Sequence, residues 1–241
     1  MLLQFFGLID FFISVFFLIN IFNFVTGFSD YGLICNNPKL LEHYSRKYVI
    51  NKDKLMNEKL SILDKNFQLP DCKFKEFVPD LKSGDNKIID KGTDDYFKEK
   101  KCVLFGLPGA FLPTCTNHHL PGYEKLYDEF KKLGIDEIYC ISVNDVFVLN
   151  NWKESGNIKK VKLISDGTCS FTKSIGMNAH WTKEKGLGER SWRYSAYIEN
   201  NMVINTFIER PFKDESVDDP FEVSDAETML SYLREKLKIK V

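Results

Sequence analysis

The sequence predicts an α/β fold, a central mixed sheet flanked by helices, over residues 62 to 241. Short apolar runs have the length and composition of buried strands, and they lie at residues 101–108, 137–143 and 161–166. Segments with helical spacing of apolar residues follow the first two runs, at residues 120–134 and 146–155. Strands that alternate with helices of this length are typical of a layered α/β domain.

Local signals support each element in turn. Pro108 and Gly109 end the first apolar run, as the end of a buried strand requires. Gly134 suits the C-terminal cap of the helix over 120–134. A short helix is predicted over 171–176, with Gly176 at its end.

The C-terminal part predicts a hairpin and a final helix. Residues 193–209 form two strand-like runs joined by Asn200-Asn201, and asparagine tolerates the positive φ of a tight hairpin turn. The last helix is expected to begin at Ser224, because Glu227 three residues later completes a capping box. Strand, helix, strand, helix, strand, hairpin and helix together describe a thioredoxin-like sheet.

Composition and cysteine spacing argue against several classes of function. The formal net charge of -1 over 241 residues gives no concentrated basic face, so nucleic acid is not expected as a partner. None of the six cysteines forms a C-x-x-C pair, which argues against a zinc knuckle and a thioredoxin-type redox pair. A disulfide framework is the alternative, although such frameworks belong mainly to short, core-poor chains. His43 and His180 are isolated, so neither a metal nor another cofactor is expected.

The N-terminal part predicts a targeting leader in two segments. Residues 1–28 are almost wholly apolar, with Asp10 as their only charged residue, and are interpreted as a secretory signal, with a retained membrane anchor as the alternative. Residues 29–61 are basic and acid-poor, typical of a transit peptide, although an amphipathic helix packed on the domain is also possible. Together they resemble the bipartite leaders of proteins sent to a secondary plastid such as the apicoplast. Mitochondrial targeting and anchoring in the secretory pathway are the alternatives, and the mature domain is not expected to be membrane-bound.

The segment around Cys115 carries the chemistry. An apolar strand stops at Pro108, the chain loops, and a helix is predicted to start near Cys115. The unpaired N–H groups and the positive dipole at a helix start favour thiolate over thiol, so Cys115 is expected to be a nucleophile near neutral pH. Attack of this thiolate on a peroxide O–O bond would give a sulfenic acid.

Several motifs resemble one family. PGAFLPTC (108–115) resembles the peroxiredoxin pattern P-x-x-x-T/S-x-x-C. The motifs HLPGY (119–123), CISVND (140–145) and RSWRYSAYIENNMV (190–203) continue the resemblance, which is to the type-5 subfamily. The resemblance covers roughly residues 62 to 241 and implies a thioredoxin-like fold, a thiol peroxidase and a homodimer.

The resemblance also implies roles for individual residues. Cys115 falls on the peroxidatic cysteine, Pro108 on the proline that shields the active-site loop, and Arg193 on the arginine beside the sulfur. The backbone N–H groups of Thr114 and Cys115 would hold the peroxide oxygens. A fixed cation at Arg193 would lower the thiol pKa and stabilise charge on the leaving oxygen.

Leu112 departs from the pattern, because the family has threonine or serine there. A lost hydrogen bond to a charged group is worth roughly 1.5–3 kcal/mol, or about ten- to a hundred-fold in rate. Three hypotheses follow: Thr114 or a water compensates, the enzyme is slower, or it prefers bulkier and more apolar hydroperoxides. A redox sensor or thiol relay with weak peroxidase activity is therefore the alternative to an enzyme.

The remaining cysteines predict a one-cysteine mechanism. Cys140 is expected to be buried, Cys169 to be partly exposed, and no cysteine follows Cys169 to resolve the sulfenic acid. Hydrogen peroxide and organic hydroperoxides would be the substrates, and glutathione with glutaredoxin the first reductant, ahead of thioredoxin. His118 and His119 are assigned to the helix surface or a dimer contact rather than to a Cys-His hydrolase.

Overall fold

The computed structural model describes residues 66–79 and 86–237. The predicted leader and transit segments lie outside these residues, as does Cys35. Within the described residues, no helix is both long and apolar enough to cross a membrane.

An eight-stranded mixed sheet forms the centre of the domain, in the order β1-β10-β9-β4-β5-β6-β2-β3. Its strands are β1 (Phe67–Gln68), β2 (Lys73–Pro79), β3 (Asn86–Gly92), β4 (Lys101–Leu107), β5 (Glu137–Ser142), β6 (Lys162–Ser165), β9 (Tyr194–Glu199) and β10 (Met202–Ile208). The three central strands β4, β5 and β6 are parallel, whereas the flanking pairs are antiparallel. A separate two-stranded sheet pairs β7 (Asn178–Trp181) with β8 (Gly188–Ser191).

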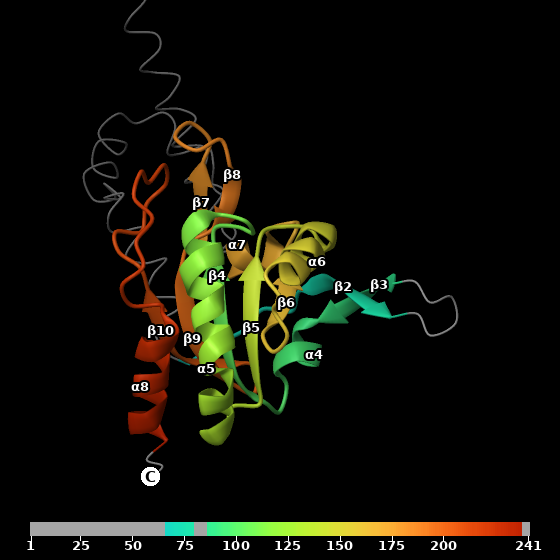
Figure 1. The fold of residues 1–241 in the computed structure, drawn as a ribbon, viewed down its shortest axis with the longest axis vertical. Helices are drawn as coiled ribbons and strands as arrows, with labels where there is room; N and C mark the ends of the chain where they lie inside the picture. Colours follow the sequence, from blue (N-terminus) through green and yellow to red (C-terminus); the bar gives the residue numbers. More distant parts are fainter. Residues whose placement is uncertain (1–65, 80–85, 238–241) are drawn as a thin grey trace, which may run out of the picture. The chain divides into compact units, whose positions relative to one another are not determined.

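Helices cover both faces of the sheet (Figure 1). They are α4 (Thr93–Phe97), the π-helix η1 (Cys115–His119), α5 (Leu120–Lys132), α6 (Val146–Ser155), α7 (Ser170–Ser174) and α8 (Ala226–Lys236). Helices α5, α6 and α8 pack on one apolar cluster, and α4 and α7 pack on the other.

Side chains of the central strands belong alternately to these two clusters, because successive residues of a strand point to opposite faces of the sheet. In β5, Ile138 and Cys140 enter the cluster under α5, whereas Tyr139 and Ile141 enter the cluster under α4 and α7. Strand β4 is buried on both faces from its second residue onward. This explains why its sequence is a continuous apolar run.

Two residue-level predictions about turns and glycines are confirmed. Asn200 and Asn201 have φ values of 47° and 63° and join β9 to β10. Gly134 and Gly176 have positive φ just after α5 and α7.

The predicted start of the last helix was wrong by one residue. Asp225 is the N-cap of α8, and its side chain accepts from the backbone N–H of Thr228. Ser224 is buried instead, and its hydroxyl donates to Glu209. Because its hydroxyl is bonded to Glu209, Ser224 does not cap the N-terminus of α8.

Candidate active site

Cys115 lies in the first turn of a helix that begins where β4 has ended. The backbone N–H of Thr116 donates to the carbonyl of Leu112 over 2.9 Å and closes this turn. The preceding loop is held by Asn144, whose side-chain oxygen accepts from the N–H of Ala110 over 3.0 Å. Cys115 itself is fully buried.

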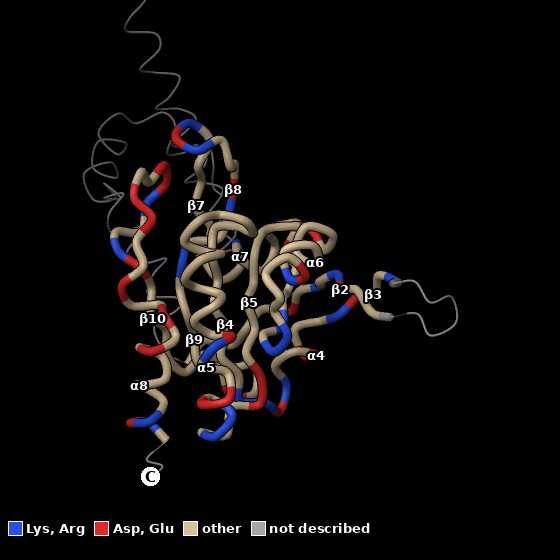
Figure 2. The backbone as a smooth tube through the Cα atoms, viewed as in Figure 1, with Lys and Arg blue, Asp and Glu red and all other residues tan. Residues whose placement is uncertain are grey.

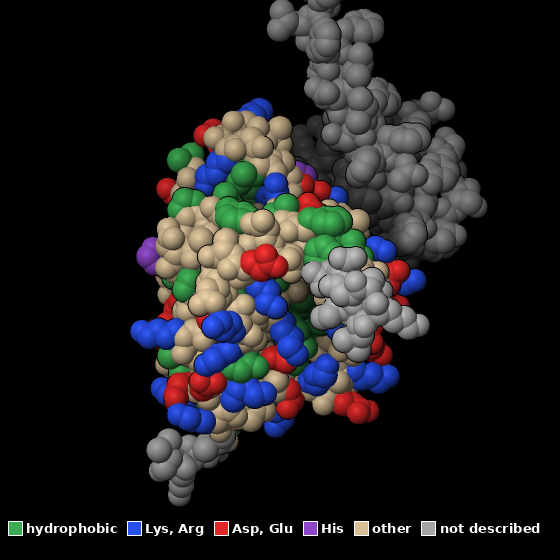
Figure 3. Space-filling view, turned by 45° about the vertical axis from the view of Figure 1, so that its right-hand side comes forward, with side chains coloured by type: hydrophobic (Ala, Val, Ile, Leu, Met, Phe, Trp, Pro, Cys, Tyr) green, Lys and Arg blue, Asp and Glu red, His purple; other side chains and the backbone are tan. Residues whose placement is uncertain are grey.

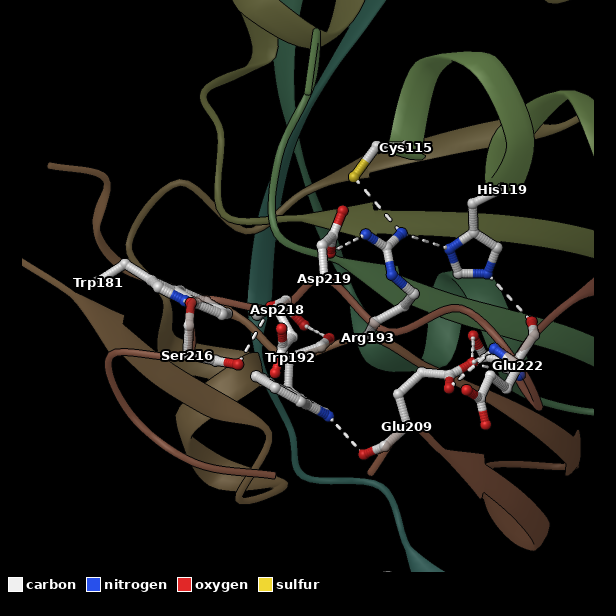
Figure 4. A network of polar contacts seen from close by, with 12 residues as sticks. Cys115, His119, Trp181, Trp192, Arg193, Glu209, Ser216, Asp218, Asp219 and Glu222 are labelled. Atoms are coloured by element: carbon white, nitrogen blue, oxygen red, sulfur yellow. Dashed lines mark hydrogen bonds and ion pairs between the residues drawn. The ribbon is translucent and has the colours of Figure 1, made fainter. Parts of the chain in front are cut away.

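Arg193 brings a buried cation to this sulfur. It directly precedes β9, and β9 pairs with β4 so that Tyr194 lies opposite Gly106 near the end of β4. Nη1 of Arg193 is 3.6 Å from Sγ of Cys115, and the arginine is 1% exposed (Figure 4). Two residues 78 positions apart in the sequence therefore meet at one end of the sheet.

Opposing effects act on the Cys115 thiol. Burial has the largest effect and leaves the pKa of Cys115 raised overall, because a thiolate is poorly solvated in the core. The Arg193 charge and the backbone N–H of Gly109 lower the pKa, and Asp219 raises it. The sequence predicted only the lowering effects. The thiolate therefore depends on the placement of Arg193, whose own pKa is raised by Cys115 and Asp219 despite the opposing effect of burial.

His119 holds the other side of the same guanidinium. Its Nδ1 lies 3.2 Å from Nη1 of Arg193, and its Nε2 lies 3.1 Å from the carbonyl oxygen of Ser224. Because that carbonyl only accepts, Nε2 carries the hydrogen and Nδ1 accepts from Arg193. Burial, reinforced by Arg193, lowers the pKa of His119 well below its usual value, so the ring is neutral. The prediction of a surface position was wrong, because His119, at the end of the π-helix η1, is fully buried.

A segment after β10, residues 209–225, completes the surroundings of Arg193. Oδ1 of Asp219 is 2.5 Å from Nη2 of Arg193, and the ring of Phe221 lies 5.7 Å from its guanidinium carbon. The buried carboxylate of Glu209 anchors this segment through the N–H groups of residues 222–224. Sequence reasoning missed Asp219 and Glu209. Their only signal was an acidic stretch that resembles solvated surface.

The other predicted site residues surround the loop. Pro108 is buried, whereas Leu112 and Thr114 are half-buried. Among the described residues, no hydrogen bond links the Thr114 hydroxyl to Cys115. The Leu112 side chain packs over Gly109, where its Cδ1 would lie 3.4 Å from a β-carbon built on the glycine. The position of the family's hydroxyl thus carries an apolar side chain against the active-site loop.

Comparisons with known proteins agree with this geometry. The Redoxin family model matches residues 68–230. A peroxiredoxin of Synechocystis is 50% identical over 145 residues, which are 60% of this chain and 76% of the relative. The chain belongs to the peroxiredoxin family. Peroxiredoxins are thiol peroxidases, and the chain is therefore an enzyme of this class.

Solved structures of peroxiredoxins share the fold. The antioxidant protein of Plasmodium falciparum, described as a 1-Cys peroxiredoxin, has a TM-score of 0.67 at 36% identity, covering 71% of this chain and 99% of its own. Prx3 of Vibrio vulnificus, solved in complex with H2O2, has a TM-score of 0.61 at 37% identity, covering 71% and 96%. The predicted thioredoxin-like fold is thereby confirmed.

The five cysteines described in this peroxiredoxin are all free thiols. Cys140 is buried as predicted, and burial raises its pKa well above the ordinary value. Cys169 is 4% exposed, so the prediction of partial exposure was wrong. It occupies a left-handed position before α7, with its side chain packed inward. Among the described residues, no group of histidine, cysteine and acidic side chains could hold a metal.

Proposed function

We propose that this peroxiredoxin reduces hydrogen peroxide and organic hydroperoxides with Cys115. The observation that carries the proposal is the buried contact between Sγ of Cys115 and Nη1 of Arg193. The thiolate attacks the outer peroxide oxygen, an S–O bond forms, and the O–O bond breaks. The electron pair leaves with the second oxygen as hydroxide or alkoxide, which takes up a proton to give water or alcohol. Sulfur is oxidised to sulfenic acid while the peroxide is reduced.

Donors around the sulfur would stabilise the leaving oxygen. Arg193 offers a fixed positive charge, and its buried Nε has no hydrogen-bond partner among the described residues. Backbone N–H groups at Thr114 and Cys115, in the first turn of the helix, would hold the peroxide oxygens. The hydrogen peroxide complex of the Vibrio relative supports hydrogen peroxide as a substrate.

An external thiol would recycle the sulfenic acid, with glutathione and glutaredoxin as the first choice and thioredoxin as the second. The burial of Cys102, Cys140 and Cys169 supports this one-cysteine mechanism, because none presents an exposed sulfur to Cys115. The one-cysteine description of the Plasmodium relative points the same way. Mass spectrometry of the peroxide-treated chain tests the mechanism. A disulfide between Cys115 and another cysteine of the same chain would contradict it.

Rapid mixing of the reduced chain with hydrogen peroxide tests the peroxidase itself. Trp192 provides the signal, because it adjoins Arg193 and donates through Nε1 to the carbonyl of Glu209. Fast oxidation that disappears in Cys115→Ser is expected. Oxidation no faster than that of a free thiol, and unchanged in the variant, would favour the redox-sensor alternative that the apolar Leu112 suggests.

Two exposed aromatic side chains support a homodimer. Phe111 in the active-site loop is 51% exposed and Phe147 at the start of α6 is 63% exposed. Figure 3 shows hydrophobic side chains gathered in the upper half of one face, with lysine and arginine side chains below. We propose that this apolar area contacts a second copy, and sedimentation of Phe147→Glu against the unchanged chain tests it. A monomer in both cases would contradict the dimer.

The leader supports import into a plastid through the secretory route. N-terminal sequencing of the native protein and imaging of a tagged full chain test this proposal. An intact N-terminus on a membrane-bound protein would favour the anchor instead.

A further inference from the structure

The carboxylate of Asp219 shields Arg193 on the solvent side. The two side chains form an ion pair in which Arg193 is 2% exposed and Asp219 is 35% exposed. Figure 4 shows Asp219 next to the edge of the guanidinium that faces Cys115. A molecule that approaches the sulfur therefore comes near a negative charge as well as the positive one.

The charges that act on Cys115 leave the reactive state negative. Arg193 and Asp219 are the two charged groups that influence the sulfur, with opposite signs. His119 is neutral and contributes only a hydrogen-bond acceptor. Once Cys115 is a thiolate, the site contains one cation, Arg193, and two anions, Cys115 and Asp219. The site then carries a net charge of about −1, and Arg193 has no unshared charge for a second anion.

The segment that carries Asp219 is acidic. Residues 210–225 contain six acidic residues and two basic residues, a net charge of −4. In Figure 2 the tube of this segment, after β10, is coloured red at its acidic positions. Glu209 anchors the C-terminal end of this segment, three residues after Asp219, through the N–H groups of residues 222–224.

We propose that Asp219 makes the site selective for neutral hydroperoxides over hydroperoxides that carry a carboxylate near the peroxide group. This inference rests on the proposed function of Cys115. The reaction is the same for both substrates, and only the free energy of bringing the substrate's charge to the sulfur differs. At a separation of roughly 7 Å and an effective dielectric constant between about 35 and 80, one unit charge changes the rate by about 3- to 10-fold.

A matched pair of substrates tests the proposal. A short hydroperoxy carboxylic acid and its methyl ester share one carbon skeleton and differ in charge. Stopped-flow oxidation of the reduced full chain gives a second-order rate constant for each, and the ester-to-acid ratio is the readout. A change in the Cys115 pKa affects both substrates alike and cancels in this ratio.

Three variants complete the experiment. The unchanged chain is expected to prefer the ester by about 3- to 10-fold, and Asp219→Asn to bring the ratio close to one, because the charges of Arg193 and the Cys115 thiolate then balance. Asp219→Glu is expected to restore the preference. Asp218→Asn removes a neighbouring exposed charge and is expected to keep the ratio of the unchanged chain. High salt is expected to reduce the preference.

Different outcomes separate this inference from the function on which it rests. A ratio that Asp219→Asn leaves unchanged overturns the role of Asp219, and so does an equal change in Asp218→Asn. Cys115→Ser reports on the function itself: if oxidation of either substrate persists there, the proposed peroxidase fails. If oxidation needs Cys115 but the unchanged chain shows no preference, only the selectivity fails.

Discussion

Replacing Glu209 by glutamine is expected to destabilise the domain strongly. Glu209 is 1% exposed, and its carboxylate accepts three backbone N–H groups of residues 222–224 and the hydroxyl of Ser224. Each donor gives about 1 kcal/mol more to a carboxylate than to a neutral amide oxygen. The lower cost of burying an uncharged side chain offsets part of this loss. We expect a net decrease of roughly 2–4 kcal/mol in the free energy of unfolding.

Thermal and urea unfolding measure this change. A loss of about 3 kcal/mol lowers Tm by roughly 6–12 °C in a domain of this size. Glu215→Gln is the matched control, because Glu215 also accepts three backbone N–H groups, those of residues 182–184, but faces solvent. Little change in Tm is expected for the control. We expect burial to make these hydrogen bonds strongly stabilising. Equal decreases in Tm for the two variants, or no decrease for Glu209→Gln, would refute this expectation.

Three further predictions concern the site and the core. Leu112→Thr is expected to raise the rate of Cys115 oxidation by hydrogen peroxide about ten- to a hundred-fold in stopped-flow mixing. Equal rates for the variant and the unchanged chain with every peroxide would contradict the lost-hydroxyl argument. Arg193→Met removes the charge that lowers the pKa of Cys115, so the thiolate should appear at higher pH and the rise of alkylation rate with pH should move upward; an unmoved profile would refute this. Gly106→Ala places a β-carbon 2.2 Å from a tyrosine ring and should cost about 1–3 kcal/mol in urea unfolding, whereas Gly122→Ala, with its nearest atom at 3.8 Å, should cost nothing. Equal stability of the two alanine variants would contradict the packing argument.

Much of the fold could be predicted because its central elements obey local rules. The parallel strands are mostly apolar, α6 begins and ends at the predicted residues, and the Asn200-Asn201 turn needs no tertiary information. The β2–β3 hairpin was missed, since charged residues interrupt the apolar pattern of both strands. The small β7–β8 sheet was missed for a related reason: its strands are short, and most of their residues are polar.

The candidate site was predicted where a motif marks it and missed where only tertiary contacts do. Cys115 and Arg193 stand in recognisable motifs, and the structure brings them together. His119 stands in a motif too, but it was assigned to the helix surface or a dimer contact, and no local signal marks the π-helix in which it is buried. Asp219 reaches Arg193 from 26 residues away in an irregular segment, and no local pattern encodes that contact.

The burial of Cys102, Cys140 and Cys169 has a consequence for the lifetime of the enzyme. An enzyme that works in oxidant exposes each of its own sulfurs to collateral damage at every turnover. Burial raises the pKa of Cys102 to about 12 and that of Cys169 to about 11, so both remain thiols and react slowly. Inactivation by excess peroxide should therefore begin with over-oxidation at Cys115, while the sulfur atoms of the core survive many catalytic cycles.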